Sequence, residues 1–410
     1  MTDSPSPQHG DTLLLRNAHL LDLEAGTWHE GDLLCVDGRI APDADAPGDA
    51  EVLDVRGGFV LPGLIDAHVH VTAFTAALGS LASTPPSYVT AQAARIMGGM
   101  LDRGFTTVRD MAGADFGLAR AQREGLVRGP RLAFGGKALS QTGGHGDSRD
   151  AGSWHHDEHP CCADHGRVAD GVDAVRVAAR DELRKGAHHI KVMASGGVAS
   201  PTDRIDSTQY SPAELRAAVE EAEAANRYVA AHAYTARAVN RALEAGVRSI
   251  EHGNLIDDRS VELLTEHDAF LVPTLVTYWA LKTEGREFGL SDDSWRKVDD
   301  VLGAGLGALE RAARGGARIA YGSDLLGGMH RHQNEEFRIR SEVQKPLDVI
   351  RSATSVAAEL LGMSGEIGTL AAGARADLLV LDGDPLADIA ALADPARHQV
   401  AVVQGGRQVK

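Results

Sequence analysis

Two histidines separated by one residue, His68 and His70, stand in the segment Gly-Leu-Ile-Asp-Ala-His-Val-His at 63–70. Imidazole is the commonest metal-binding side chain at neutral pH. The surrounding residues are apolar and follow Pro62, which is typical of a short buried strand entered from a turn. Strand residues two apart point the same way, about 7 Å apart, so both imidazoles could hold one divalent ion. Two histidines packed in a core are the alternative.

Further polar side chains stand at or just past the ends of later apolar runs: Lys191, His232, His252 and Asp324. Four histidines, a lysine and an aspartate at strand ends are a stronger signal for a metal site than any one of them. The lysine is the exception, because an ammonium with an ordinary pKa of about 10.4 repels cations. A phosphate or substrate contact and a buried Schiff-base lysine are its other interpretations.

The elements that must position these residues alternate between apolar strand-like runs and helical patterns. After the run at 63–70, the predicted strands are 106–109, 131–134, 189–193, 228–232, 248–252, 269–272 and 318–321. Ser211, Pro212 and Glu214 form a capping pattern that opens a helix. Eight such units predict an α/β fold, a (β/α)₈ TIM-like barrel, whose chemistry lies where the strands end.

The two ends of the chain share a different sequence pattern, in which short apolar runs are separated by turn residues. Short apolar runs at 13–15, 33–36 and 52–55, with a turn at Asp37-Gly38, predict antiparallel strands, and similar runs return at 376–381 and 400–406. We expect a small β-sandwich domain formed from both termini. The predicted domains are 1–60 for its first part, 61–362 for the barrel and 363–410 for its second part.

Composition restricts the partners. A net charge of −17 argues against nucleic acid and anionic membranes, since both require a basic surface. The three cysteines, Cys35, Cys161 and Cys162, are too few for a disulfide framework and indicate reduced thiols in a cytoplasmic protein. Residues 1–10 lack the apolar core of a signal peptide, and no run is long enough to span a membrane.

The sequence resembles the amidohydrolase superfamily over nearly the whole chain. The matching segments are 62–70, 190–197, 231–234, 250–254 and 322–324. The resemblance implies that Lys191 reacts with carbon dioxide to form a carbamate, whose oxygens bridge two divalent ions, zinc being expected from the nitrogen and oxygen ligands. His68, His70 and Asp324 would hold one ion, and His232 and His252 the other. A metal-bridging hydroxide would then attack the scissile carbonyl, while Asp324 passes the proton to the leaving nitrogen.

Within the superfamily, the segments 138–145, 193–203, 232–235 and 251–258 resemble a bacterial prolidase-like group of Xaa-Pro dipeptidases. This resemblance implies cleavage of the C-terminal amide bond of Xaa-Pro dipeptides or N-acyl-proline, small-molecule substrates, and a homo-oligomer. His145 would polarise the substrate carbonyl and Tyr234 would bind the terminal carboxylate. Ordinary packing beside His232 is the alternative for Tyr234.

Other residues keep two interpretations. The segment 147–165, which departs from the family pattern, predicts a lid over the site or a structural metal site built from His155, His156, His159, Cys161, Cys162 and His165. Arg331 could bind a substrate carboxylate or form a surface ion pair. Arg109 with Asp110 could be a structural pair, and Lys137 has the same ambiguity.

Four other functions compete with the dipeptidase. Lys191 counts against imidazolonepropionase-type enzymes, and the terminal β domain counts against phosphotriesterase-type ones. An amidase or carboxypeptidase for other N-acyl amino acids or amide-linked toxins has the same metal ligands and stays the main alternative. A metal-free, non-catalytic relative is disfavoured because all six ligand positions are filled.

Overall fold

The computed structural model describes residues 12–42, 47–149 and 163–410. All eight runs predicted as barrel strands form strands, and they pair in parallel. They are β6 (Leu64–Val69), β7 (Phe105–Asp110), β8 (Arg131–Phe134), β11 (Ile190–Met193), β12 (Val229–Thr235), β13 (Ser249–Leu255), β14 (Phe270–Val272) and β15 (Arg318–Ile319). The α/β class with a parallel sheet is therefore confirmed.

The parallel strands form two separate hydrogen-bonded sheets, here called arcs, rather than one continuous ladder. One arc has the order β6-β7-β8, and the other is β10-β9-β11-β12-β13-β14-β15, with β9 at Ala138–Ser140 and β10 at Gly166–Val168. The chain leaves the first arc after β8 and joins the second at β9, across Gly135, Gly136 and Lys137. A Cβ on Gly135 would lie 2.7 Å from the imidazole of His189, so this crossing requires glycine. On the other side, Ala67 N donates to Tyr321 O at 2.8 Å, which joins β6 to the residues after β15.

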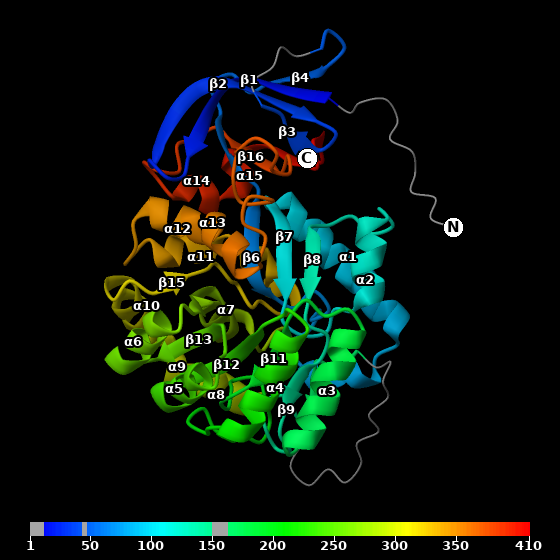
Figure 1. Ribbon diagram of the computed structural model, residues 1–410, viewed down its shortest axis with the longest axis vertical. Helices are drawn as coiled ribbons and strands as arrows, with labels where there is room; N and C mark the ends of the chain where they lie inside the picture. The colour runs from blue at the N-terminus through cyan, green and yellow to red at the C-terminus, as the bar shows by residue number, and fades with distance from the viewer. Residues whose placement is uncertain (1–11, 43–46, 150–162) are drawn as a thin grey trace.

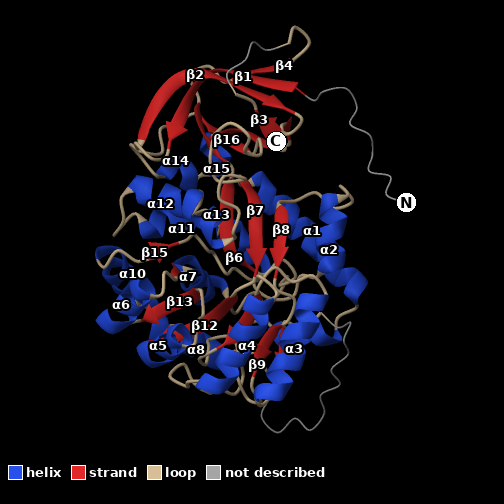
Figure 2. Ribbon diagram, in the orientation of Figure 1, coloured by secondary structure: helices blue, strands red, loops and turns tan. Residues whose placement is uncertain are grey.

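Helices surround these strands (Figure 2). The helix predicted from its capping pattern is α4, in which Ser211 and Glu214 form a complete capping box. The helices are α1 (Pro86–Asp102), α2 (Phe116–Arg123), α3 (Val172–Arg184), α4 (Pro212–Ala224), α5 (Ala236–Glu244), α6 (Asp258–Glu266), α7 (Leu275–Glu284), α8 (Asp292–Lys297), α9 (Asp299–Leu302), α10 (Gly305–Arg314), α11 (Glu335–Arg340), α12 (Pro346–Ser352), α13 (Ser355–Leu360), α14 (Ala390–Ala393) and α15 (Pro395–His398), with 3₁₀ turns η1 (Leu78–Ser83) and η2 (Gly327–His332). None of the helices in the described ranges is long and apolar enough to cross a membrane.

Strands from both ends of the chain form one mixed sheet, which lies at one end of the molecule (Figure 1). Its order is β18-β17-β16-β5-β1-β2-β3, with β4 beside β1; the bounds are β1 (Thr12–Asp22), β2 (Thr27–Val36), β3 (Arg39–Ile40), β4 (Glu51–Asp54), β5 (Phe59–Pro62), β16 (Leu378–Leu381), β17 (Gln399–Gln404) and β18 (Arg407–Gln408). The predicted hairpin is present, since Asp37 and Gly38 both have positive φ between β2 and β3. The pairing gives a single sheet, whereas a sandwich was expected.

The terminal sheet is continuous with the strand that carries the first two histidines. Strand β5 pairs with β1 on one edge and with β16 on the other. Only Gly63 separates β5 from β6, and a Cβ there would lie within 3 Å of the Thr106 side chain. The small sheet therefore fixes where β6 enters the parallel arc. The domain boundaries themselves stay a prediction.

Candidate metal centre and active site

Three of the predicted ligands converge at the end of β6. His70 Nε2 lies 3.2 Å and His68 Nε2 3.4 Å from Asp324 Oδ1, and one ligand atom from each of the three residues lies within 4.8 Å of the others. Asp324 is held against the strand by its own N–H, which donates to the carbonyl of His68 at 2.8 Å. Its φ of 51° places the backbone in the left-handed region. Such conformations cost free energy and gather at functional sites.

The hydrogen bonds of His68 and His70 orient both rings for metal binding. His68 Nδ1 donates to the Glu251 carboxylate at 2.8 Å, and His70 Nδ1 donates to the carbonyl of Ala112 at 3.0 Å. Both rings therefore turn Nε2 toward Asp324. Burial opposes ionisation of Asp324, but the neighbouring imidazoles outweigh it and hold its pKa well below the ordinary value. Burial likewise opposes protonation of His70, but Asp324 outweighs it and raises the pKa of that ring. Two imidazole nitrogens and a carboxylate form a donor set suited to a divalent ion.

His232 and His252 form the second pair. His232 Nε2 donates to the carbonyl of Gly196 at 3.0 Å, and His252 Nδ1 hydrogen-bonds with the Thr274 hydroxyl at 2.8 Å. The two rings lie 4.6 Å apart, and burial holds the pKa of each well below its ordinary value. Both are therefore neutral, the form that binds metals.

Lys191, in β11, lines the same cavity with 2% of its surface exposed. Among the described residues, its amine has no hydrogen-bond or ion-pair partner. Burial lowers its pKa to about 8, although Glu251 and Asp324 oppose this. A buried ammonium without a partner is costly, whereas a neutral amine can add carbon dioxide. The unpaired amine, the four imidazoles and Asp324 thus form a donor set that would hold divalent ions, with Lys191 available for carboxylation.

Sequence reasoning missed the buried charges beneath this cluster. Glu251 is fully buried and accepts hydrogen bonds from His68, from Arg109 Nη2 at 2.9 Å and from the Ser249 hydroxyl. Burial opposes its ionisation, but Arg109 and His68 outweigh it and lower its pKa. Arg109, left above as a possible partner of Asp110, instead pairs with Glu251 and so supports the ring of His68.

A backbone feature explains why Glu251 was missed. Alternation along a strand would place Glu251 and His252 on opposite faces. His252 has a φ of 78°, and the register shifts between Ala233 and Thr235 in the neighbouring strand. Both side chains consequently meet His68, one by the hydrogen bond and the other at 5.0 Å between ring centroids. The one feature of the sequence that could have pointed to Glu251 is its position directly before the candidate ligand His252.

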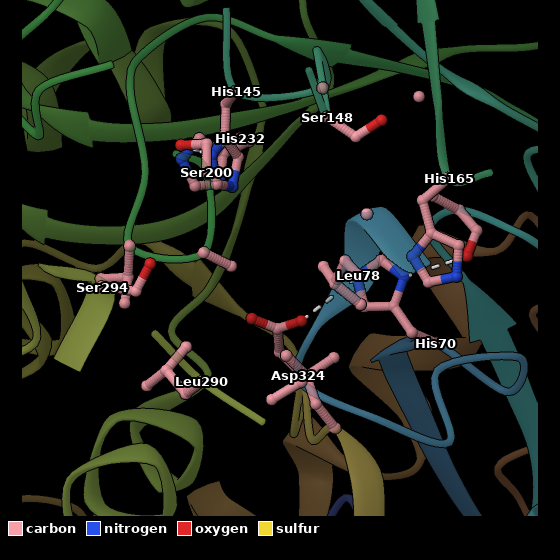
Figure 3. Close-up of a pocket in the computed structure, with 18 of the residues that line it drawn as sticks. His70, Leu78, His145, Ser148, His165, Ser200, His232, Leu290, Ser294 and Asp324 are labelled. Carbon is pink, nitrogen blue, oxygen red and sulfur yellow. Dashed lines mark hydrogen bonds and ion pairs between the residues drawn. The ribbon is translucent and has the colours of Figure 1, made fainter. Parts of the chain in front are cut away.

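Two of the three residues predicted to contact substrate, His145 and Tyr234, line the same cavity, which has a volume of about 370 Å³. Figure 3 shows His145 over His232 in this cavity. The His145 ring stacks on His232 at 4.2 Å, and its Nδ1 donates to the hydroxyl of Ser200 at 2.8 Å. Ser200 in turn donates to Asp203. Tyr234 lies between His232 and His252, at 4.7 and 5.3 Å, and its hydroxyl accepts from Tyr278 at 3.3 Å.

Arg331 is not among these residues. Its half-exposed guanidinium donates to Glu284 at 2.5 Å and to the carbonyl of Gly328 at 2.6 Å, and it is not part of the described cavity lining. Of the two interpretations of Arg331 given above, the structure therefore agrees with the surface ion pair. Lys137 lines a second cavity of about 540 Å³ beside the first.

The segment that departs from the family pattern is described at its two ends. His165 is buried, stacks on His70 at 5.1 Å and hydrogen-bonds with Thr72. His155, His156, His159, Cys161 and Cys162 lie outside the described residues, so the lid and the structural metal stay predictions.

Comparison with known proteins agrees with this geometry. The model of the amidohydrolase family matches residues 59–409. The chain is 33% identical over 375 residues to ochratoxinase from Aspergillus niger, covering 86% of this chain and 75% of that protein. It is 51% identical to a prolidase solved in complex with N-methylphosphonate-L-proline, with a TM-score of 0.94 over 97% of this chain and 99% of the other. A Xaa-Pro dipeptidase with methionine bound in its active site is 26% identical, with a TM-score of 0.86 over 97% and 100%.

The family match spans most of the chain, and the solved prolidase and dipeptidase superpose on nearly all of it. Both comparisons include the strands that carry His68, His70, Lys191, His232 and His252. The protein belongs to the amidohydrolase family.

Proposed function

We propose that the protein is a metal-dependent hydrolase of Xaa-Pro dipeptides or N-acyl-proline, which cleaves the amide bond before the proline. The observation that carries this proposal is the single cavity in which six candidate metal ligands meet His145 and Tyr234. The proposed specificity for proline is supported by the likeness to a 51% identical prolidase solved with N-methylphosphonate-L-proline.

In this proposal the chain's own side chains have separate tasks. Asp324, an ionised carboxylate in the cavity, takes the proton of the attacking water and passes it to the leaving nitrogen. Tyr234 donates its hydroxyl proton to the terminal carboxylate, since that hydroxyl lies in the cavity beside His232 and His252. His145, held by Ser200, faces the substrate carbonyl.

The ligands His68, His70, Asp324, His232 and His252, with Lys191 as a carbamate, would hold two divalent ions, for which zinc is proposed. When bound, these ions would polarise the scissile carbonyl and lower the pKa of the attacking water. The protein's contribution is to orient the four imidazoles, which hydrogen bonds with Glu251, Ala112, Gly196 and Thr274 accomplish.

A substrate panel on protein of measured metal content tests the proposal. Dipeptides ending in proline and N-acyl-prolines should be hydrolysed with higher kcat/KM than dipeptides ending in arginine. A panel without preference for proline would refute the proline specificity. Activity that does not follow the metal content would refute metal dependence.

The 33% identity to ochratoxinase favours a second candidate, an amidase for other N-acyl amino acids or amide-linked toxins. The same ligand set would serve it, because the loops rather than the fold select the substrate. Adding ochratoxin to the panel separates the two, since a prolidase should leave it intact or hydrolyse it far more slowly than a proline dipeptide.

A further inference from the structure

Aromatic rings form a row across the active-site cavity. His165 stacks on His70 at 5.1 Å, His70 is 5.4 Å from His68, His68 is 5.0 Å from His252, and His252 is 5.3 Å from Tyr234. Asp324 contacts the middle of the row, at His68 and His70. These contacts connect Tyr234 through four successive ring pairs to His165, which follows Asp164 in the chain.

Asp164 is a buried carboxylate without a counter-ion among the described residues. It lines the cavity with 6% of its surface exposed. Within the described ranges, its oxygens accept hydrogen bonds from the Ser148 hydroxyl at 3.2 Å and the Gly166 N–H at 3.3 Å, and no lysine, arginine or histidine pairs with it. The remaining residues, 1–11, 43–46 and 150–162, contain no lysine or arginine, and their histidines are His9, His155, His156 and His159.

The other carboxylates that line the cavity already have cationic or imidazole partners. Asp147 accepts hydrogen bonds from Arg149 Nε at 2.7 Å and from Arg149 Nη2 at 2.5 Å. Asp324 Oδ1 lies 3.4 Å from His68 Nε2 and 3.2 Å from His70 Nε2. A buried charge left without a partner is costly, so Asp164 is the lining carboxylate that a cationic ligand would stabilise most.

We propose that Asp164 binds the α-ammonium group of the substrate, so that the preferred substrates are dipeptides with a free N-terminus rather than N-acyl-prolines. This inference rests on the proposed function. In a dipeptide, the ammonium is on the carbon next to the scissile carbonyl, and the carboxylate is on the carbon next to the scissile nitrogen. The two charges thus lie on either side of the reacting bond, and Asp164, Asp324 and Tyr234 all line the one cavity that would hold it. Figure 3 shows Ser148, the partner of Asp164, on the side of the cavity where His165 lies, across from Leu290 and Ser294.

An N-acyl cap removes the positive charge and leaves Asp164 unpaired in the complex. Because this carboxylate is shielded from water, its attraction to an ammonium is weakened less by solvent and salt than that of a surface pair. Losing one partner of a buried charge pair lowers affinity by at least about 30-fold. The discrimination should appear in kcat/KM, since the ammonium is held in both the substrate complex and the transition state.

Alanyl-proline and N-propionyl-proline test this directly, because they differ only in the ammonium. The wild-type enzyme should favour alanyl-proline by about 30-fold or more in kcat/KM. Asp164→Asn should bring this ratio close to one while keeping turnover of N-propionyl-proline. The matched control is Asp147→Asn, whose carboxylate is already paired, and it should keep the wild-type ratio.

A measurement on the wild-type enzyme alone covers the case in which the variant does not fold. The α-amino group of a dipeptide titrates near pH 8, so the ratio of the two kcat/KM values should fall as the pH rises through this range. Equal rates for the two substrates, a ratio that persists in Asp164→Asn, or a ratio independent of pH would overturn the role of Asp164. Hydrolysis of neither substrate would instead refute the proposed function.

Discussion

Replacing Glu251 with glutamine tests how the buried carboxylate supports the metal-binding face of His68. Glu251 Oε2 accepts from His68 Nδ1 at 2.8 Å, while Oε1 accepts from Arg109 at 2.9 Å and from Ser249. Glutamine keeps the shape but has only one oxygen. Its NH₂ group must face either His68 or Arg109, and both present an N–H there.

The charge of Arg109 decides which arrangement forms. If the amide NH₂ faced Arg109, the buried guanidinium would lose its hydrogen bond as well as the opposite charge. We therefore expect the amide oxygen to stay on Arg109; because the counter-charge is lost in either arrangement, the unfolding free energy should fall by about 3 to 5 kcal/mol. The NH₂ group then donates to His68 Nδ1, which moves the ring proton to Nε2. Because Nε2 is the nitrogen that faces Asp324, metal affinity should fall about 10- to 100-fold.

Two measurements separate these effects. Urea unfolding of metal-stripped protein reports the change in stability, and metal retention against a competing chelator reports the change in affinity. Glu262→Gln is the control, because Glu262 is 62% exposed and pairs only with Arg259 on the same helix surface; it should change stability by less than about 0.5 kcal/mol. If Glu251→Gln matched the wild type in both measurements, the supporting role of Glu251 would be wrong.

The remaining predictions concern four other residues. Lys191→Ala should lose bound metal and most activity, and added short carboxylates should restore part of it; full metal content and rate without them would contradict a carbamate. Tyr234→Phe should lower kcat/KM for substrates with a free carboxylate, by an amount that corresponds to a loss of about 1.5 to 3 kcal/mol of transition-state stabilisation. An equal loss on amidated substrates would argue against a contact between Tyr234 and the carboxylate. Arg331→Ala should change kcat/KM less than about twofold, because its guanidinium pairs with Glu284 at the surface; a loss confined to substrates with a carboxylate would reverse this. Burial raises the pKa of Glu336 to about 8, so the folded protein keeps a proton that the unfolded chain releases near its ordinary pKa of 4.5. Stability should therefore fall between these pH values by up to about 1.4 kcal/mol per unit, and urea unfolding of Glu336→Gln should lack this slope.

The sequence predicted the strands well because parallel strands buried on both faces give continuous apolar runs. It did not predict the break in the third strand, where β8 ends at Phe134 and β9 begins at Ala138 in the other arc. Strand β9 has three residues, which is too few to show an alternation of apolar and polar side chains. Its partners, β10 and β11, lie far from it in the sequence. A local pattern can reveal a strand but not the arc that it joins.

The six candidate metal ligands could be expected together because the ends of parallel strands meet at one edge. Glu251 could not, since its direction depends on the left-handed backbone of His252. For Arg331 the sequence left both a substrate contact and a surface ion pair open, and its side chain pairs with Glu284. Sequence spacing gives the position of a residue along the chain and leaves the direction of a long side chain open.

The pairing of β5 with β16 has a consequence for protein synthesis. The strand that leads into His68 and His70 leaves the ribosome early, while its neighbour in the sheet emerges only after the whole parallel arc has been translated. Contacts between segments so far apart form slowly. The nascent chain therefore needs β16 before β5, the strand that leads into His68 and His70, is paired on both edges, and the proposed metal site should be completed only after β16 has been translated.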